Sequence, residues 1–420
     1  MTVPEQTTAP GETASDAPIP LLEPREGLPD VTASPEGLQA AASALASGSG
    51  PIAVDAERAS GYRYGHRAYL IQIRREGAGT VLVDPIGFHD LSVLAEPLRE
   101  AEWVLHAASQ DLPCLADLGL TPSTLFDTEL AGRLLGYPRV GLGAMCESVL
   151  GLALEKGHAA VDWSTRPLPE AWLRYAALDV EVLIELRDAL AAELEASGKL
   201  EWARQEFAAV AAAPPAPPRV DPWRRTSGMH RVRKARQLAV VRELWLARDE
   251  VARSRDTSPG RVLPDSAIVE AALRMPETQD ELVSLPVFGG RANKRQASRW
   301  FGAIERARNC PDSQLPSTTL VSDAPPPARS WGDKNPEAAA RLAVLRPAVA
   351  AIADEHGLPT ENLLAPDTVR RVAWDPPADA SPDVVAKRLA SHGARPWQIE
   401  LTARPIAKAL DRVRREAETS

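Results

Sequence analysis

The sequence contains a short apolar run that ends in two carboxylates, Pro51-Ile52-Ala53-Val54-Asp55-Ala56-Glu57. The run predicts a buried strand. Residues two apart on an extended chain point to the same side, so Asp55 and Glu57 are expected to lie close together and to repel unless a cation neutralises them. Carboxylate oxygens in this arrangement suit Mg²⁺ or Mn²⁺. The alternative is a solvated strand end that carries two ordinary acids.

The segments around this run predict an α/β domain. Three more strands are expected at residues 69–73, 80–84 and 101–106. The pattern is helical from residue 111, and residues 169–197 form one long amphipathic stretch. Its apolar stripe has a spacing of four residues: Leu178, Val182, Leu186, Leu190 and Leu194. Strands followed by helices predict a layered α/β domain over residues 31–205.

Further acids recur at two places downstream. Asp111 follows the strand expected to end at His106 and precedes a helix, so its carboxylate would lie at the end of the sheet. An aspartate at this position could equally cap the helix. Tyr175 and Asp179 are four residues apart in the helical stretch, so they share a face, away from the apolar stripe. This pair either lines a cleft or lies on an ordinary surface.

Changes in composition divide the rest of the chain. Residues 1–30 are rich in Pro, Thr, Ala and acids, and we expect them to be disordered because they cannot bury enough surface to offset their ordering entropy. Proline-rich spacers separate two blocks with helical patterns. The predicted boundaries are 206–228 and 311–334 for the linkers and 229–310 and 335–415 for the helical blocks. A Leu-Pro step and a late Trp occur in both blocks, which predicts a duplicated helical domain.

Composition and missing motifs narrow the function classes. In this chain of 420 residues, 44% are hydrophobic and 25% charged, which is typical of globular proteins. No run approaches the roughly 18 apolar residues of a membrane helix, so no membrane contact is expected. The three cysteines, Cys114, Cys146 and Cys310, form no CxxC pair, which favours a reducing cytoplasm. The sequence lacks a P-loop, HExxH, GxSxG and GxGxxG, which leaves carboxylate chemistry.

Taken together, the acidic motifs resemble those of the DEDDy family of 3′–5′ exonucleases, and most closely ribonuclease D. The matching segments are 54–58, 63–73, 106–112, 126–136, 162–168 and 173–180. The resemblance covers about residues 45–200 and implies an RNase H-like α/β fold, a mixed sheet flanked by helices. The block at 229–310 resembles the HRDC domain, a small all-α unit. The block at 335–415 resembles a second, more divergent HRDC unit.

The resemblance implies a metal-dependent 3′–5′ exoribonuclease. Such an enzyme would trim the 3′ ends of structured RNA such as tRNA precursors and release 5′-mononucleotides. Asp55, Glu57 and Asp179 would hold one of two divalent ions (Mg²⁺ or Mn²⁺), and Asp55 and Asp111 the other. Tyr175 would orient the attacking water and help to take its proton. Two alternatives stay open: a 3′–5′ exonuclease acting on DNA, and a non-catalytic nucleic-acid-binding adaptor.

Basic residues between the first domain and the first helical block are expected to contact RNA. Residues 219–242 contain eight basic residues and one acid, although the net charge of the chain is −9. A charge run is usually a solvated face, but this one lies between a nuclease and a helical module. The predicted nucleic-acid contacts are His106, Arg166, Arg224, Arg225, Arg231, Arg233, Lys234 and Arg236, with Gln72 as a further candidate. The protein is expected to be a cytoplasmic monomer.

Overall fold

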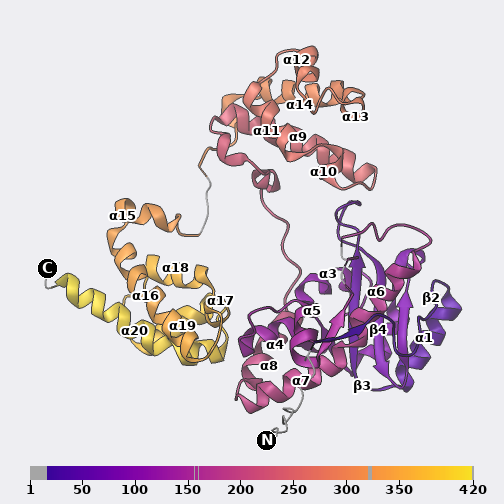
Figure 1. The fold of residues 1–420 in the computed structure, drawn as a ribbon. Coiled ribbons are helices and arrows are strands. Elements are labelled where there is room, and N and C mark those ends of the chain that lie inside the picture. The colour runs from indigo at the N-terminus through magenta and orange to yellow at the C-terminus, as the bar shows by residue number, and fades with distance from the viewer. Residues whose placement is uncertain (1–16, 156, 159, 320–323, 419–420) are drawn as a thin grey trace, which may run out of the picture.

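The computed structural model describes residues 17–155, 157–158, 160–319 and 324–418 of the chain. Figure 1 shows three parts: a domain built on a sheet, up to residue 211, and two helical blocks at 235–309 and 336–418. Within the described ranges, no helix is both long and apolar enough to span a bilayer.

The first domain is built on a six-stranded mixed sheet. In order across the sheet, the strands are β2 (Val31–Thr32), β5 (Gly79–Val83), β4 (Ala68–Glu76), β3 (Ser49–Arg58), β6 (Glu102–Leu105) and β7 (Thr124–Asp127). β4 is antiparallel to both β3 and β5, and the other neighbours are parallel. The predicted mixed sheet and its four predicted strands are confirmed. β7 was not predicted, because its apolar run is short and leads directly into a helix.

Helices cover the sheet and carry part of the candidate site. They are α1 (Pro35–Ser47), α2 (Ser92–Arg99), α3 (Leu112–Ala116), α4 (Thr128–Leu135), α5 (Leu142–Met145), α6 (Glu170–Glu181), α7 (Leu183–Ala196) and α8 (Leu200–Ala211). α6 packs on β3, β4 and β5, where Ala176 and Ala177 meet Leu70 and Leu82. The predicted stripe from Leu178 to Leu194 is buried. The predicted single helix is instead divided into α6 and α7 at Val182, which caps both helices with φ −95° and ψ −12°.

The first helical block has a hydrophobic core of its own. It comprises α9 (Ala235–Ser254), α10 (Pro259–Val262), α11 (Asp265–Arg274), α12 (Gln279–Ser284), α13 (Arg291–Lys294) and α14 (Ala297–Asn309). Phe288 and Trp300 are fully buried in this core. Arg248, itself buried, donates to Asp265 at 2.6 Å and so ties α9 to the start of α11.

The first block also docks on the loop that follows β3. Arg261 donates to the carbonyl of Gly61 at 2.8 Å and lies over the ring of Tyr62. The Tyr64 hydroxyl donates to Asp249 at 3.0 Å. The block is therefore attached three residues beyond Arg58, at the end of the strand that carries Asp55 and Glu57.

The second helical block repeats the opening of the first. It comprises α16 (Pro336–Glu355), α17 (Thr360–Leu363), α18 (Pro366–Trp374), α19 (Pro382–Ser391) and α20 (Pro396–Glu418), preceded by the short α15 (Trp331–Lys334). The helices α16, α17 and α18 have 20, four and nine residues. The first three helices of the first block, α9, α10 and α11, have 20, four and ten.

The second block packs directly against the first domain, and the two share one hydrophobic cluster. Trp397 stacks on Trp202 of α8, with ring centroids 4.9 Å apart, and its indole nitrogen donates to Glu206 at 3.0 Å. Gly136, with φ +83°, approaches the carbonyl of Gly357 so closely that a Cβ would lie 2.4 Å from it. Any other residue at position 136 would therefore push the two parts apart.

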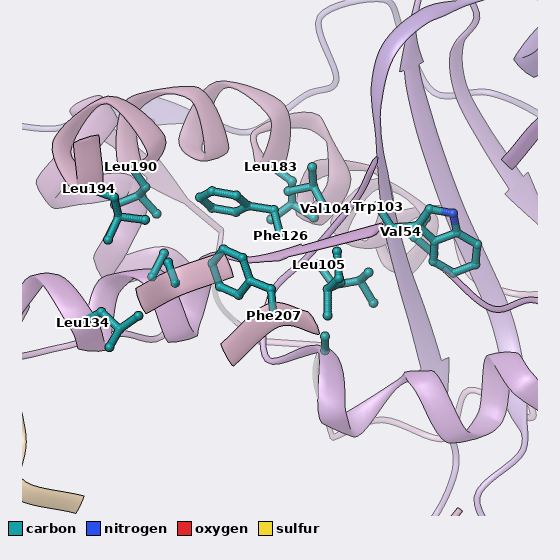
Figure 2. Packing of buried hydrophobic residues seen from close by; sticks show 14 of the residues in the cluster. Val54, Trp103, Val104, Leu105, Phe126, Leu134, Leu183, Leu190, Leu194 and Phe207 are labelled. Atoms are coloured by element: carbon teal, nitrogen blue, oxygen red, sulfur yellow. The ribbon is translucent and has the colours of Figure 1, made fainter. Parts of the chain in front are cut away.

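Two predicted boundaries are wrong. α8 continues past residue 205 to Ala211, because Phe207 is buried against Phe126 with ring centroids 4.8 Å apart (Figure 2). Residues 17–30, predicted to be disordered, contain β1 (Ile19–Leu21), which pairs with β8 (Leu152–Leu154). Few apolar residues lie there, but strand pairing and ion pairs supply the order. The rest of the predicted disordered tail, residues 1–16, lies outside the described residues.

Candidate active site

Strand β3 and helix α6 bring three carboxylates together. Asp55 and Glu57 project from the same face of β3, and Asp179 reaches them from α6, which packs on that strand. One oxygen of each of the three carboxylates lies within 4.8 Å of the other two. The cluster predicted from residues 124 positions apart is therefore assembled, which excludes a solvated strand end as the account of Asp55 and Glu57.

Asp111 faces the same cavity from the opposite side, beyond β6. It precedes α3, but its side chain makes no capping hydrogen bond to that helix. Its carboxylate lies 3.2 Å from the guanidinium of Arg58. The helix-cap alternative is therefore excluded. Asp111 lies beside the three-acid cluster, paired with Arg58, and is not one of the three carboxylates that approach within 4.8 Å.

The acids line a cavity of about 720 Å³. Tyr175, one helical turn before Asp179, lies on its wall, and His106 and Gln110 close the side nearest Asp111. This volume lies in the range of small-molecule binding sites. Tyr175 and Asp179 thus line a cleft, which decides against an ordinary surface pair.

Burial and mutual repulsion dominate the electrostatics of the site. Burial, then Asp55, Asp179 and Asp111, raise the pKa of Glu57 well above its ordinary value. Burial, then Asp55, raise the pKa of Asp179 well above its ordinary value, and burial also raises the pKa of Asp55. All donors are carboxylate oxygens, so the set fits a hard divalent cation, whose charge would offset this repulsion.

Tyr175 stays a neutral phenol in this surrounding. Burial first, and then the carboxylates of Asp179, Glu57 and Asp55, raise its pKa far above the ordinary value. A phenol that keeps its proton can donate a hydrogen bond and orient a water molecule. It is a poor acceptor for that water's proton.

Of the residues predicted to contact the nucleic acid, one lines the cavity and others are held within the protein. His106 lines the cavity, but burial lowers its pKa to about 4, so it offers hydrogen bonds and no positive charge at neutral pH. Arg166 donates to Asp84, Tyr69, Trp163 and Thr165. These bonds use all five of its N–H groups, so Arg166 holds the surrounding loop in place, and its predicted RNA contact finds no support in this arrangement. Gln72, opposite Asp55 in β4, is fully buried and out of reach of a strand in the cavity.

The predicted contacts in the basic run, residues 219–242, also divide into side chains that bond within the protein and side chains that are exposed. Arg224 bonds to Asp221 and Ser317, and Arg236 bonds to Asp312 and to carbonyls at the end of α14. Both stabilise the first helical block through these bonds, and their predicted phosphate contacts stay predictions. The remaining predicted contacts are exposed: Arg225, Arg231, Arg233 and Lys234.

Two supporting residues were not predicted. Arg58, directly after the two acids of β3, contacts Asp111 and also donates to the carbonyl of Gln110. Buried Asp127 accepts from the backbone of Ala107 and Ala108 and caps α4. Asp127 thereby fixes the turn that precedes Asp111, in which Ala107 has φ +58°. Both residues lie in segments that carry the family resemblance, 54–58 and 126–136, but neither was predicted as a site residue.

The metal-free protein is expected to lose stability as the pH rises from 3.8 to about 8. Burial, and then repulsion by Asp55, raise the pKa of Asp111 from 3.8 to about 8. Between these values the folded state binds more protons than the unfolded chain, so the free energy of unfolding falls with pH. Mn²⁺ binds the deprotonated carboxylates and should stabilise the protein more at the upper end of this range.

Thermal unfolding across this pH range, with and without Mn²⁺, checks this expectation. Asp111→Asn should flatten the metal-free slope, and exposed Asp117→Asn should leave it unchanged. A melting temperature that rises with pH in the metal-free protein would contradict the account.

Comparisons with known proteins match this arrangement. A profile described as "3'-5' exonuclease" matches residues 31–195, one described as "HRDC domain" matches 237–304, and one described as "3' to 5' exonuclease C-terminal domain" matches 324–410. A solved protein from Bifidobacterium adolescentis is 38% identical, with a TM-score of 0.86 over 94% of this chain and 100% of its own. Escherichia coli RNase D is 26% identical, with a TM-score of 0.66 over 92% of this chain and 98% of its own.

The fold and the acidic cavity define a 3′–5′ exonuclease followed by an HRDC domain. Among curated proteins, "Ribonuclease D" of Gluconacetobacter diazotrophicus is 30% identical over 337 residues, which cover 78% of this chain and 82% of that protein. The chain belongs to the ribonuclease D family and is a 3′–5′ exoribonuclease, which confirms the resemblance found in the motifs.

Proposed function

We propose that this exoribonuclease hydrolyses RNA from the 3′ end with two divalent ions, Mg²⁺ or Mn²⁺, and releases 5′-mononucleotides. The observation that carries the proposal is the approach of Asp55, Glu57 and Asp179 to within 4.8 Å. These three acids would hold one ion, and Asp55 and Asp111 the other. Bound ions supply an activated water and stabilise charge on the leaving oxygen.

The protein's own groups would align the reactants. The hydroxyl of Tyr175 donates a hydrogen bond to Asp179, and its oxygen would accept a hydrogen bond from the attacking water and so orient that water toward the terminal phosphodiester. Arg58 holds Asp111 in place by charge. His106, neutral and hydrogen-bonded to Thr128 at 2.9 Å, offers a hydrogen bond at the cavity wall for the terminal nucleotide.

The placement of the first helical block supports structured RNA, tRNA precursors included, as the substrate. The block is anchored at the loop after β3 by Gly61, Tyr62 and Tyr64, so RNA bound there lies beside the strand that carries two of the acids. E. coli RNase D is described as an exoribonuclease involved in structured RNA processing. The second block, with the helix order of the first, would be a divergent HRDC unit.

A basic quartet is expected to supply the phosphate contacts of the linker: Arg225, Arg231, Arg233 and Lys234. Replacing all four with Gln should weaken RNA binding and reduce the dependence of log affinity on log salt by roughly 0.7 per lost contact on a single strand. A matched control replaces four exposed basic residues elsewhere: Arg99, Arg204, Arg346 and Lys387. Equal affinity loss and parallel salt slopes in both variants would show that the quartet binds no RNA.

A paired assay on a 3′-RNA end and a 3′-DNA end of the same sequence tests the substrate class. Preferential shortening of RNA is expected. Equal or faster shortening of DNA would favour a DNA exonuclease, and binding without shortening would favour an adaptor. We also propose a cytoplasmic location, which the three free cysteines support, and a monomeric state.

A further inference from the structure

Residues 17–30 join two walls of the active-site cavity, and we call this segment the strap. Its first part, β1, runs parallel to β8, with Ile19 opposite Leu152 and Leu21 opposite Leu154. Leu154 lines the cavity. The strap therefore holds the wall that faces the acids through backbone pairing.

The second part of the strap forms ion pairs with the opposite wall. Glu23 lies 2.8 Å from Arg174, the residue before Tyr175 in α6. Arg25 binds Glu185 of α7 and lies 4.0 Å from Glu181, the last residue of α6. Arg25 thus spans the break at Val182, where α6 and α7 part.

Glu181, at the junction of α6 and α7, depends on the contact with Arg25. Its side chain is fully buried, and within the described residues its two oxygens have no hydrogen-bond partner. The cations beside it are Arg25 at 4.0 Å and Arg74 at 3.5 Å. Arg74 is itself held by Glu26 of the strap at 2.9 Å. Arg74 also donates to Thr80 of β5 at 2.9 Å. A buried carboxylate depends on such neighbours, so the strap supplies one of the two cations beside Glu181 and helps to hold the other.

We propose that the strap is a positioning element for the metal site and that Arg25 is its main positioning residue. α6 is short, ends at Glu181 and places Asp179 two residues earlier, so the orientation of its last turn decides whether Asp179 meets Asp55 and Glu57. The strap fixes that turn from outside the cavity. This inference rests on the proposed function of the acids as metal ligands.

The test uses the full chain with three strap substitutions, Glu23→Gln, Arg25→Gln and Glu26→Gln. A control of the same net charge change carries Glu195→Gln, Glu201→Gln and Arg204→Gln, all exposed. Titration calorimetry with Mn²⁺ should give a dissociation constant about 10-fold higher for the strap variant, the lower range for residues that orient metal ligands. The control should match the wild type. Turnover of the strap variant should recover as Mn²⁺ is raised.

If the triple variant does not fold, single substitutions at Arg25 still test the strap proposal. Arg25→Lys keeps the charge and should retain most of the Mn²⁺ affinity, whereas Arg25→Gln should lose several-fold. Wild-type Mn²⁺ affinity in a folded Arg25→Gln protein would overturn the strap proposal. Absence of Mn²⁺ binding by the wild type would instead overturn the proposed metal site, so the two failures are distinguishable.

Discussion

Asp55→Asn or Asp179→Asn is expected to abolish RNA hydrolysis and to leave the fold intact. An amide cannot neutralise a divalent ion as a carboxylate does, and Asp55 is predicted to serve both ions. The loss should exceed the 10²–10³-fold that removal of one catalytic hydrogen-bond donor costs. The metal-free variants should be no less stable than the wild type, because burial and repulsion already raise the pKa of both acids.

Single-turnover release of nucleotides from RNA at saturating Mg²⁺ measures this effect, with thermal unfolding as the check on folding. Asp117→Asn removes an exposed carboxylate and serves as the matched control. If either site variant kept a substantial share of wild-type turnover, the assignment of these acids as metal ligands would be wrong.

Tyr175→Phe is expected to lower turnover by about 10²-fold or more, the range for loss of a group that positions or transfers a proton. The ring keeps its packing in the cavity wall, and only the hydroxyl that orients water is lost. RNA affinity and Mn²⁺ affinity should hardly change. The same substitution at Tyr137, whose hydroxyl donates to Glu193 away from the cavity, controls for loss of a phenol. Unchanged turnover of Tyr175→Phe would place this residue outside the reaction.

Each acidic motif alone had an ordinary alternative, and it was the order of the motifs along the chain, with the resemblance it carries, that predicted the four acids. The strand before Asp55 and the i, i+4 pair of Tyr175 and Asp179 define which way the side chains point. Asp111 was ambiguous from sequence, since a helix cap and a ligand look alike. The structure excludes the cap because that side chain makes no capping bond.

The other differences between prediction and structure arise from partners far away in the sequence, which a local sequence pattern does not indicate. Arg166 looks like a free cation in sequence, but Asp84, 82 residues earlier, binds it. The strap has too few apolar residues to predict order, yet α6 and β8 supply its ion pairs and its strand partner. The helix α8 extends beyond residue 205 because Phe207 packs on Phe126. Phe126 lies in β7, a strand that was not predicted, so the sequence did not indicate this contact.

The central claim is tested most directly with RNA labelled at its 5′ end, offered with a free 3′-hydroxyl or with a blocked 3′ end. The account predicts stepwise shortening of the labelled RNA with a free 3′-hydroxyl, protection of the blocked RNA, and complete loss of shortening when EDTA removes divalent ions. Cleavage of the blocked RNA, or undiminished shortening in EDTA, would contradict a metal-dependent 3′–5′ exoribonuclease.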